Sequence, residues 1–278
     1  MSHLLNRSLS LHIGARSVQG ALRAAWFQKR VLARSRHAFG PSTLDIDVSM
    51  TQTELEDTYR EAVDAVVSEL DSTASALNAH LQVVLADSRV HYDVVSGDYG
   101  GASDRHLQAI ANACIGEILG DQAPNQVIRW QLQPDMRHLL ISSMDTQDVE
   151  FVVQAASRHQ LSLRSLQPDF CRKWNLHARS LPNGTGVFAT TCSNHLIVAY
   201  AKSGSITALS CGPGANLTGL TAIGRLTKDT IDERVDRMLS NVGLNTADVK
   251  AFVLVAPDSE TVSTSPRWTV IRMAEELA

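Results

Sequence analysis

A pattern of three short strands joined by tight turns occurs twice in this chain. The first copy spans residues 9–38, where apolar residues alternate before a turn at Gly14 and a mostly small and apolar run follows from Val18. The second copy runs through residues 186–210, with a Lys-Ser-Gly turn at 202–204. Period-two alternation is typical of strands, and repetition of one supersecondary unit indicates a duplicated architecture. We therefore expect two lobes with the same strand pattern.

Helices and further strands follow each copy of the repeat. Apolar residues at helical spacing predict helices over residues 51–70, 145–159, 168–176 and 230–242. Strands are predicted over residues 81–86, 162–166 and 251–256, and residues 268–277 close the chain. The run at 81–86 is apolar throughout, which is typical of a strand in a parallel sheet. The acidic residues of the first helix, Asp64 and Glu69 among them, are interpreted as a solvated face.

Residues 86–144 differ from both repeats and predict a small α+β module. A strand at 92–95 leads through a Gly-rich loop at 97–103 to a helix at 107–119, and two alternating runs at 126–131 and 138–143 pair around a Gln-Pro-Asp turn. The Gly-rich loop precedes a helix, as phosphate-binding loops do, but it lacks the Lys-Ser/Thr pair and the standard glycine spacing. We interpret it as a loop of the module.

Composition excludes several classes of function. Of the 278 residues 44% are apolar and 19% are charged, which is ordinary for a globular protein. A net charge of -4 and a pI near 6.2 do not indicate a basic surface that would bind nucleic acid or an anionic membrane. No signal peptide and no membrane-spanning run is recognisable, so a cytosolic protein without direct membrane insertion is expected.

Metal and catalytic chemistry find no support in the spacing of reactive residues. The four cysteines are far apart, and no two of the ten histidines have the spacing with supporting Cys or acid that a zinc site needs. No serine lies in a Gly-x-Ser-x-Gly elbow or a comparable activating context. The sequence therefore predicts neither a metal site nor a catalytic residue.

The duplicated hairpin-plus-strand unit, with a module inserted between the strand at 81–86 and the helix at 145–159, resembles the actin and sugar-kinase superfamily. More specifically it is similar to the bacterial PilM and GspL proteins of type IV pilus and type II secretion platforms, and more distantly to FtsA. The resemblance implies an α/β, two-lobed actin-like ATPase fold in which a ribonuclease H-like unit is duplicated. The expected domains are residues 1–85 and 145–181 for the first lobe, 86–144 for the inserted α+β module, and 182–278 for the second lobe, with a Leu-Pro-Asn-Gly linker at 181–184.

The first phosphate loop of the family aligns with residues 11–18. Where the family has Asp-Ile-Gly followed by hydroxyl residues, this chain has His12 in place of the acid. The family's Asp helps to hold hydrated Mg²⁺, which prefers oxygen ligands, so histidine does not suit that role. The residues that would otherwise approach the phosphates are Gly14, Ala15, Arg16 and Ser17.

The second phosphate loop aligns with residues 187–196, and it has lost its acid as well. Phe188 replaces the acid and Thr190 replaces the glycine, while Thr191 and Ser193 retain hydroxyl groups that can donate hydrogen bonds. With both carboxylates absent, little is left to neutralise a triphosphate and its metal.

Two further stretches complete the comparison with the family. The Gly-Gly-Asp segment aligns with residues 211–218, which keep Gly212 and Gly214 without the acid. The Gly-Gly turn beside adenine aligns with Ala256 and Pro257, which are bulkier and stiffer than two glycines. The resemblance therefore implies a degenerate nucleotide site, no cofactor and no enzymatic activity.

The PilM resemblance also implies a partner. It predicts a scaffold that is cytoplasmic and peripheral to the inner membrane, where it binds the cytoplasmic N-terminal tail of a bitopic, PilN-like protein in a groove involving residues 86–143. A motor ATPase and further copies of the chain are additional candidate partners, and the sequence names no contact residues. The alternative is an active member that binds ATP and Mg²⁺ through residues 14–17 and 190–193, and a filament-forming protein is a second rival.

Overall fold

The computed structural model describes residues 7–14, 17–24, 31–38, 52–74, 79–192, 195–213, 228–257 and 264–273. The chain forms two compact units. Unit 1 comprises the described residues up to Ala86 together with Gln147–Pro168, and unit 2 comprises Asp87–Thr146 and the described residues from Asp169 onwards. Each unit is built around a five-stranded sheet.

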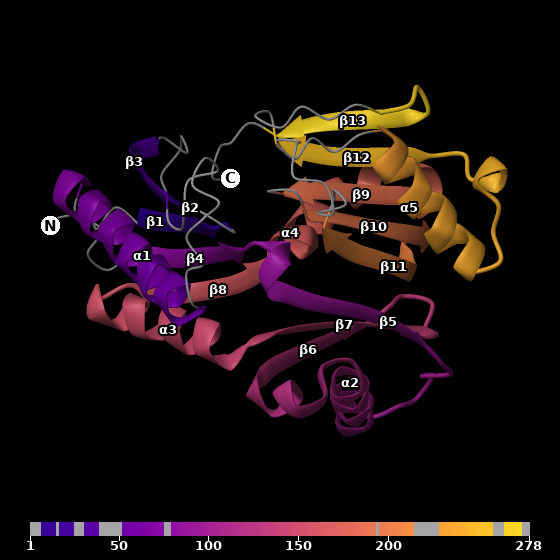
Figure 1. Cartoon of the computed structure of the whole chain (residues 1–278), viewed down its shortest axis with the longest axis horizontal. Coiled ribbons are helices and arrows are strands. Elements are labelled where there is room, and N and C mark those ends of the chain that lie inside the picture. Colours follow the sequence, from indigo (N-terminus) through magenta and orange to yellow (C-terminus); the bar gives the residue numbers. More distant parts are fainter. Residues whose placement is uncertain are drawn as a thin grey trace, which may run out of the picture. The chain divides into compact units, whose positions relative to one another are not determined.

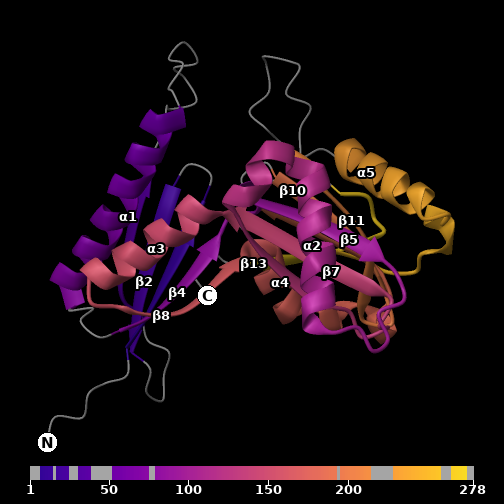
Figure 2. The same cartoon turned by 90° about the horizontal axis from the view of Figure 1, so that it is seen from below.

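The sheet of unit 1 has the order β3-β2-β1-β4-β8. β1, β2 and β3 form an antiparallel meander, and β1, β4 and β8 are parallel. Helices α1 and α3 lie side by side in both views and are joined by contact of the Tyr59 and Phe151 rings (Figures 1 and 2). The bounds are β1 Arg7–Ile13, β2 Ser17–Ala24, β3 Val31–Ala38, α1 Gln52–Ala74, β4 His80–Leu85, α3 Thr146–Arg158 and β8 Ser162–Pro168.

One face of this sheet carries the core of unit 1. Leu9, Leu11 and Ile13 alternate along β1 and are at most 2% exposed. The apolar stripe of α1 packs on the same face, because a Cβ built at Gly20 of β2 would lie 2.5 Å from side-chain atoms of both Val66 and Leu70. The alternation along β1 and the helical stripe of α1 thus meet across one interface.

The acidic side of α1 is not only a solvated face. Asp64 accepts a hydrogen bond from Arg158 at 3.0 Å and lies 3.3 Å from the ring nitrogen of His159, both at the end of α3. Glu69 accepts a hydrogen bond from Ser35 of β3. The acidic residues of α1 therefore do more than face solvent, because Asp64 and Glu69 also join α1 to neighbouring elements.

The main sheet of unit 2 repeats the order of the first, as β11-β10-β9-β12-β13. β9, β10 and β11 are antiparallel, and β9, β12 and β13 are parallel. The bounds are α4 Asp169–His177, β9 Gly186–Cys192, β10 His195–Lys202, β11 Ser205–Pro213, α5 Lys228–Asn241, β12 Phe252–Pro257 and β13 Trp268–Met273. The predicted internal repeat is confirmed, since two segments far apart in sequence form sheets of identical topology.

The inserted segment folds as the expected α+β module. Its antiparallel sheet has the order β5-β7-β6, and α2 packs on one face through Leu107, Ala111 and Ile115. Ser103 caps α2 by accepting a hydrogen bond from the backbone of His106. Residues 97–103 form a loop, as expected. The bounds are β5 Val90–Ser96, α2 Asp104–Leu119, β6 Gln126–Leu132 and β7 His138–Asp145.

The grouping of segments differs from the expected lobes in two respects. The inserted module belongs to the same compact unit as the second-lobe sheet, and so does α4 with the residues that follow it up to 181. The chain crosses between units after Ala86, Thr146 and Pro168, rather than at the Leu-Pro-Asn-Gly sequence. The predicted domain boundaries themselves stay a prediction. Among the described residues, no helix combines the length and the apolar character needed to cross a membrane.

The close approach of α1 to β2 is testable by substitution of Gly20. Gly20→Ala should lower the free energy of unfolding by about 1–3 kcal/mol, because the new methyl group overlaps Val66 and Leu70. Gly116→Ala is the matched control, since a Cβ at this position in α2 meets nothing within 4 Å. It should raise stability by about 0.5–1 kcal/mol through helix propensity. Urea denaturation measures both, and a neutral Gly20→Ala would contradict the packing.

Candidate functional site

The first predicted phosphate loop lies in unit 1 at the turn between β1 and β2. His12 is half-buried in β1, between Gln19 of β2 and Val84 of β4 in the strand register. The backbone N–H of Gly14 donates to the Ser17 carbonyl at 2.8 Å, and a Cβ at Gly14 would lie 2.9 Å from that oxygen. The turn therefore requires glycine for its own geometry. Ala15 and Arg16 lie outside the described residues.

The second predicted loop lies in unit 2, and its acid position is inside the protein. The Phe188 side chain is fully buried. Its ring packs edge-to-face against Trp174 at 5.2 Å between centroids and against Phe170 at 6.4 Å. Both partners belong to α4, which covers this face of β9. Aromatic packing of this kind leaves residue 188 no access to a ligand.

Thr190 and Thr191 follow Phe188 on β9 and are at most 1% exposed. Their hydroxyl groups are buried, and neither has a hydrogen-bond partner among the described residues. In the family alignment these residues should line a phosphate site, but in this structure both side chains are enclosed. Ser193, the remaining hydroxyl of this loop, lies outside the described residues.

The strand register brings the other predicted positions of unit 2 to one end of its sheet. Thr191 is level with Leu196 of β10, which is level with Gly212 of β11. Thr190 is level with Val255 of β12, next to Ala256 and Pro257. The predicted cleft positions of this unit thus gather at the carboxyl end of β9 and β12. The side chain of Pro257 and all of Gly214 lie outside what the structure describes.

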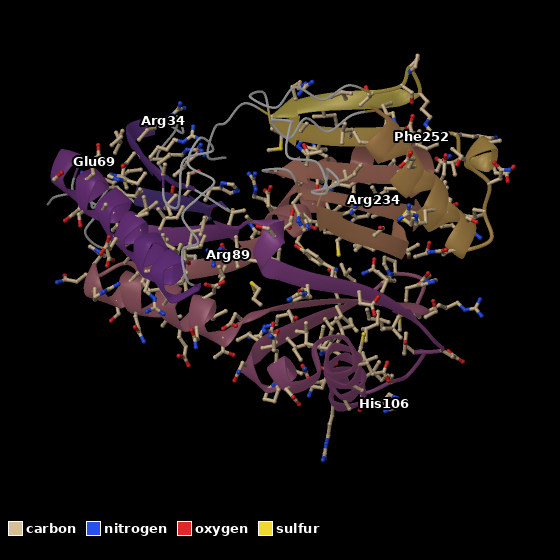
Figure 3. All side chains as sticks on the ribbon, viewed as in Figure 1. Arg34, Glu69, Arg89, His106, Arg234 and Phe252 are labelled. Atoms are coloured by element: carbon tan, nitrogen blue, oxygen red, sulfur yellow. The ribbon has the colours of Figure 1, made fainter. Side chains whose placement is uncertain are left out.

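A cationic side chain lies beside this end of the sheet. Arg234 of α5 donates to the Leu196 carbonyl at 3.4 Å, and its guanidinium would lie 3.0 Å from a Cβ at Gly212 (Figure 3). Burial lowers the pKa of His195, and the charge of Arg234 lowers it further. The neutral imidazole is therefore favoured. Among the described residues, no group of three or more His, Cys, Asp or Glu could hold a metal ion.

A buried ion pair lies behind β9, and sequence analysis missed it. Lys173 of α4 pairs with Asp169 at 2.7 Å and donates to the Thr191 carbonyl at 2.8 Å. The side chains of Lys173 and Asp169 are 3% and 2% exposed, and Arg172 also bonds Asp169 at 3.1 Å. The available signal was the i, i+4 spacing of Asp169 and Lys173 at a helix start. The pair fastens α4 to β9.

A second buried carboxylate, Asp87, lies in the 3-10 turn Asp87–Arg89 that follows β4. Its Oδ1 accepts hydrogen bonds from the Tyr92 hydroxyl at 2.6 Å and from the Phe170 backbone at 2.9 Å. Burial raises the pKa of Asp87 to about 7, and Asp169 raises it further, while both hydrogen bonds and the charge of Lys173 oppose the rise. No motif or spacing in the sequence singles out Asp87.

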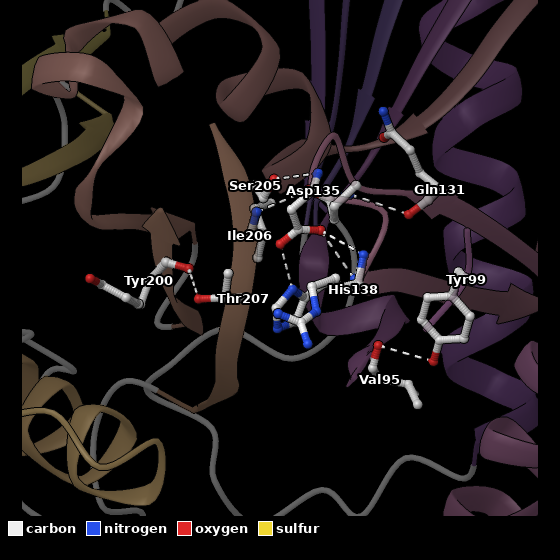
Figure 4. Close-up of polar contacts among 11 residues, drawn as sticks. Val95, Tyr99, Gln131, Asp135, His138, Tyr200, Ser205, Ile206 and Thr207 are labelled. Atoms are coloured by element: carbon white, nitrogen blue, oxygen red, sulfur yellow. Dashed lines mark hydrogen bonds and ion pairs between the residues drawn. The ribbon is translucent and has the colours of Figure 1, made fainter. Parts of the chain in front are cut away.

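The inserted module is fixed to β11 by polar contacts at its β6–β7 turn. The Gln133 side chain accepts a hydrogen bond from the Ile206 backbone at 3.0 Å, and Ser205 accepts one from the Asp135 backbone at 3.1 Å (Figure 4). Asp135 in turn bonds the His138 ring at 2.6 Å. Gln133 and Ser205 are buried. The turn predicted from its Gln-Pro-Asp sequence therefore joins the module to the second-lobe sheet.

The opposite side of the module ends in an edge strand, β6. Among the described strands β6 pairs only with β7. Ile128, Trp130 and Leu132 pack on the α2 side, and Trp130 donates to Gln108 of α2 at 3.0 Å. Arg129 and Gln131 alternate with them and are exposed. An edge strand with one anchored face presents backbone donors and acceptors to any segment that pairs with it.

The comparisons with known proteins identify the fold. No protein-family model and no curated protein matches the sequence. Among solved structures, the cytoplasmic domain of EpsL, an inner-membrane component of the type II secretion system of Vibrio cholerae, has a TM-score of 0.54 at 11% identity, covering 98% of this chain and 92% of that one. A PilM-PilN type IV pilus biogenesis complex has a TM-score of 0.60 at 13% identity, covering 90% and 80%.

A protein of unknown function from Bacteroides thetaiotaomicron with an actin-like ATPase fold has a TM-score of 0.56 at 8% identity, covering 94% of this chain and 86% of that one. At such identities the likeness establishes the fold. The chain has the two-lobed, α/β actin-like ATPase fold, with the structural likeness to GspL and PilM proteins that the sequence predicted.

Restoring the family's acid at residue 188 tests whether this position faces a nucleotide. Phe188→Asp should lower the free energy of unfolding by about 3–5 kcal/mol or more, because it removes a buried ring and buries a carboxylate. It should give no affinity for Mg-ATP. Phe188→Leu is the control and should cost about 1 kcal/mol. Denaturation and calorimetry measure both effects, and a stable Phe188→Asp protein that binds Mg-ATP would contradict the assignment.

Proposed function

We propose that this chain is a scaffold of a type IV pilus or type II secretion assembly platform and does not turn over ATP. The observation that carries the first half of the proposal is the likeness to EpsL and PilM over nearly the whole chain. The second half rests on Phe188, which lies fully buried where an active member has an acid. Without that acid, and with His12 at the equivalent position of unit 1, a metal triphosphate lacks its carboxylates.

The partner in this proposal is the cytoplasmic tail of a bitopic, PilN-like inner-membrane protein, and the support for it is the likeness to a PilM-PilN complex. Binding such a tail places the scaffold at the inner membrane from the cytoplasmic side without a lipid-seeking segment of its own. A motor ATPase and a second copy of the chain are additional candidate partners in this proposal. The nucleotide site, in this proposal, is a relic that contributes packing.

The open edge of β6 is the part of the module that suits such a tail. An extended segment added to this edge gains main-chain hydrogen bonds, which supply affinity without requiring a preformed pocket. Trp130 and its apolar neighbours hold β6 on α2, so the edge is rigid before binding. A rigid edge reduces the entropy that association costs.

Calorimetry with Mg-ATP tests the first part of the proposal. We expect a dissociation constant weaker than about 100 µM, which corresponds to less than about 5.5 kcal/mol of binding free energy. The reason is the loss of the acids that would hold the metal. Affinity tighter than that limit would favour the active ATPase instead. The His12→Asp variant is a useful control, since restoring one acid should not restore binding while Phe188 fills the other position.

Site-specific photo-crosslinking tests the tail site in intact bacterial cells. A photoreactive phenylalanine in place of Arg129, on β6, should form an adduct with a protein that has one membrane span, and peptide sequencing should locate the crosslink in its cytoplasmic tail. The same substitution at Glu117, which is exposed on α2 in the same module, should give no such adduct. Equal labelling from both positions, or adducts with soluble proteins alone, would argue against this surface.

A further inference from the structure

Both points where the chain enters unit 2 coincide with buried carboxylates. Asp87 directly follows Ala86, the last residue of the first segment of unit 1, and Asp169 directly follows Pro168. Their relative exposures are 2% and 1%. Buried acids are rare unless they are paired, and neither residue belongs to the predicted nucleotide positions. The two groups therefore need a physical account of their own.

The two carboxylates are stabilised in different ways. Asp169 has two cationic partners, Lys173 at 2.7 Å and Arg172 at 3.1 Å. Among the described residues Asp87 has no cation within ion-pair distance, and its partners are the Tyr92 hydroxyl and the Phe170 backbone. Both of these donors reach Oδ1, which leaves Oδ2 as the atom that can hold a proton. A buried acid with only neutral donors binds its proton more readily than one beside a cation.

Titratable groups on α4, β5 and β11 face Asp87. From α4 it faces Asp169, Cys171 and Lys173, and from β5 it faces Tyr92. From β11 it faces Cys211. The remaining titratable groups nearby are tied elsewhere: Arg172 bonds Asp169, and His195 of β10 interacts with Arg234. Burial raises the pKa of both thiols and of the phenol, so they are neutral near pH 7, and Asp169 and Lys173 are the charges that act on Asp87.

We propose that Asp87 is a proton-controlled anchor for the two chain entries into unit 2. With a proton on Oδ2, the neutral side chain accepts both hydrogen bonds at Oδ1 and holds the start of β5 and the start of α4 together. When the proton leaves for bulk water, the carboxylate is buried beside Asp169 without a cation of its own. The ionised form therefore loosens the anchor, through hydration or local opening of these two entries.

The sign of the pH effect follows from the raised pKa of Asp87, which lies at about 7 in the folded chain against 3.8 for the ordinary side chain. Between these values the folded state retains a proton that the unfolded state has released. The stabilising contribution of this proton is complete below about pH 4 and is lost as the pH rises to about 7. Within that window the unfolding equilibrium constant increases up to about tenfold per pH unit from this group alone.

Asp87→Asn provides the sharpest test, because an amide has the shape of the protonated acid and keeps the carbonyl acceptor for Tyr92 and Phe170. Urea denaturation from pH 5 to pH 8 should show that the wild type loses stability relative to Asp87→Asn as the pH rises. Amide exchange in β5 and at the start of α4, corrected for intrinsic rates, should be faster in the wild type at pH 8 than at pH 6, by up to about tenfold. The variant should not show this change.

Asp93→Asn is the matched control on β5, the strand that follows the Asp87 turn, since Asp93 accepts hydrogen bonds from Cys114 and Val94 rather than facing Asp169. It should retain the wild-type pH profile. Tyr92→Phe removes a donor that favours the ionised form, so it should move the midpoint of the Asp87 transition to higher pH. A structural role of Tyr92 alone would lower stability without moving that midpoint.

Direct titration keeps the proposal falsifiable if a variant fails to fold. In carbon-13 spectra of the wild-type chain, the Asp87 carboxyl signal should titrate with a midpoint near pH 7. A midpoint below about pH 5, within the usual range for aspartate, would overturn the proposal. Identical pH profiles for the wild type and Asp87→Asn would overturn it as well. Neither result depends on ATP binding or on the membrane partner, so the proposed function is tested separately.

Discussion

The burial of β9 on both faces is the constraint on which unit 2 depends. Val187 and Ala189 face the cluster that includes α5, whereas Phe188 faces the rings of α4. A strand enclosed in this way cannot hold an ionised side chain without a partner, because the desolvation cost is too large. Phe188, which the resemblance to actin-like ATPases aligns with an acid, is part of this core.

The same strand organises the charges behind it. Lys173 reaches the Thr191 carbonyl of β9 and, in doing so, is held beside Asp169. That pair supplies the negative charge that faces Asp87 without giving Asp87 a cation of its own. The result is one buried acid with two cationic partners and another whose pKa is raised to about 7. Both acids lie where the chain enters unit 2, and the hydrogen bonds of Asp87 join the first strand of the inserted module to α4.

The inserted module uses one side for attachment and leaves the other open. Gln133 and Asp135 at its β6–β7 turn bond the first residues of β11, and β5 lies beside β11 in the same unit (Figure 1). The edge strand β6 lies across the module sheet from β5. A module that is fixed at its turn and open at an edge can carry a partner segment without rearranging its core. This arrangement suits a scaffold better than a catalytic lid.

The sequence by itself determined the order of strands and helices, since two copies of one period-two pattern predicted two sheets that turned out to share one topology. The resemblance also predicts that His12 and Phe188 stand where the family has acids, and this alignment stays a prediction. Only the tertiary structure decided that Phe188 is enclosed by α4, that Asp87 lies beside Asp169 at a separation of 82 positions, and that the module joins β11. Hydrophobic periodicity and sequence motifs indicate which face of an element, or which loop, a residue occupies. Burial and charge coupling arise from elements distant in sequence, so no local pattern encodes them.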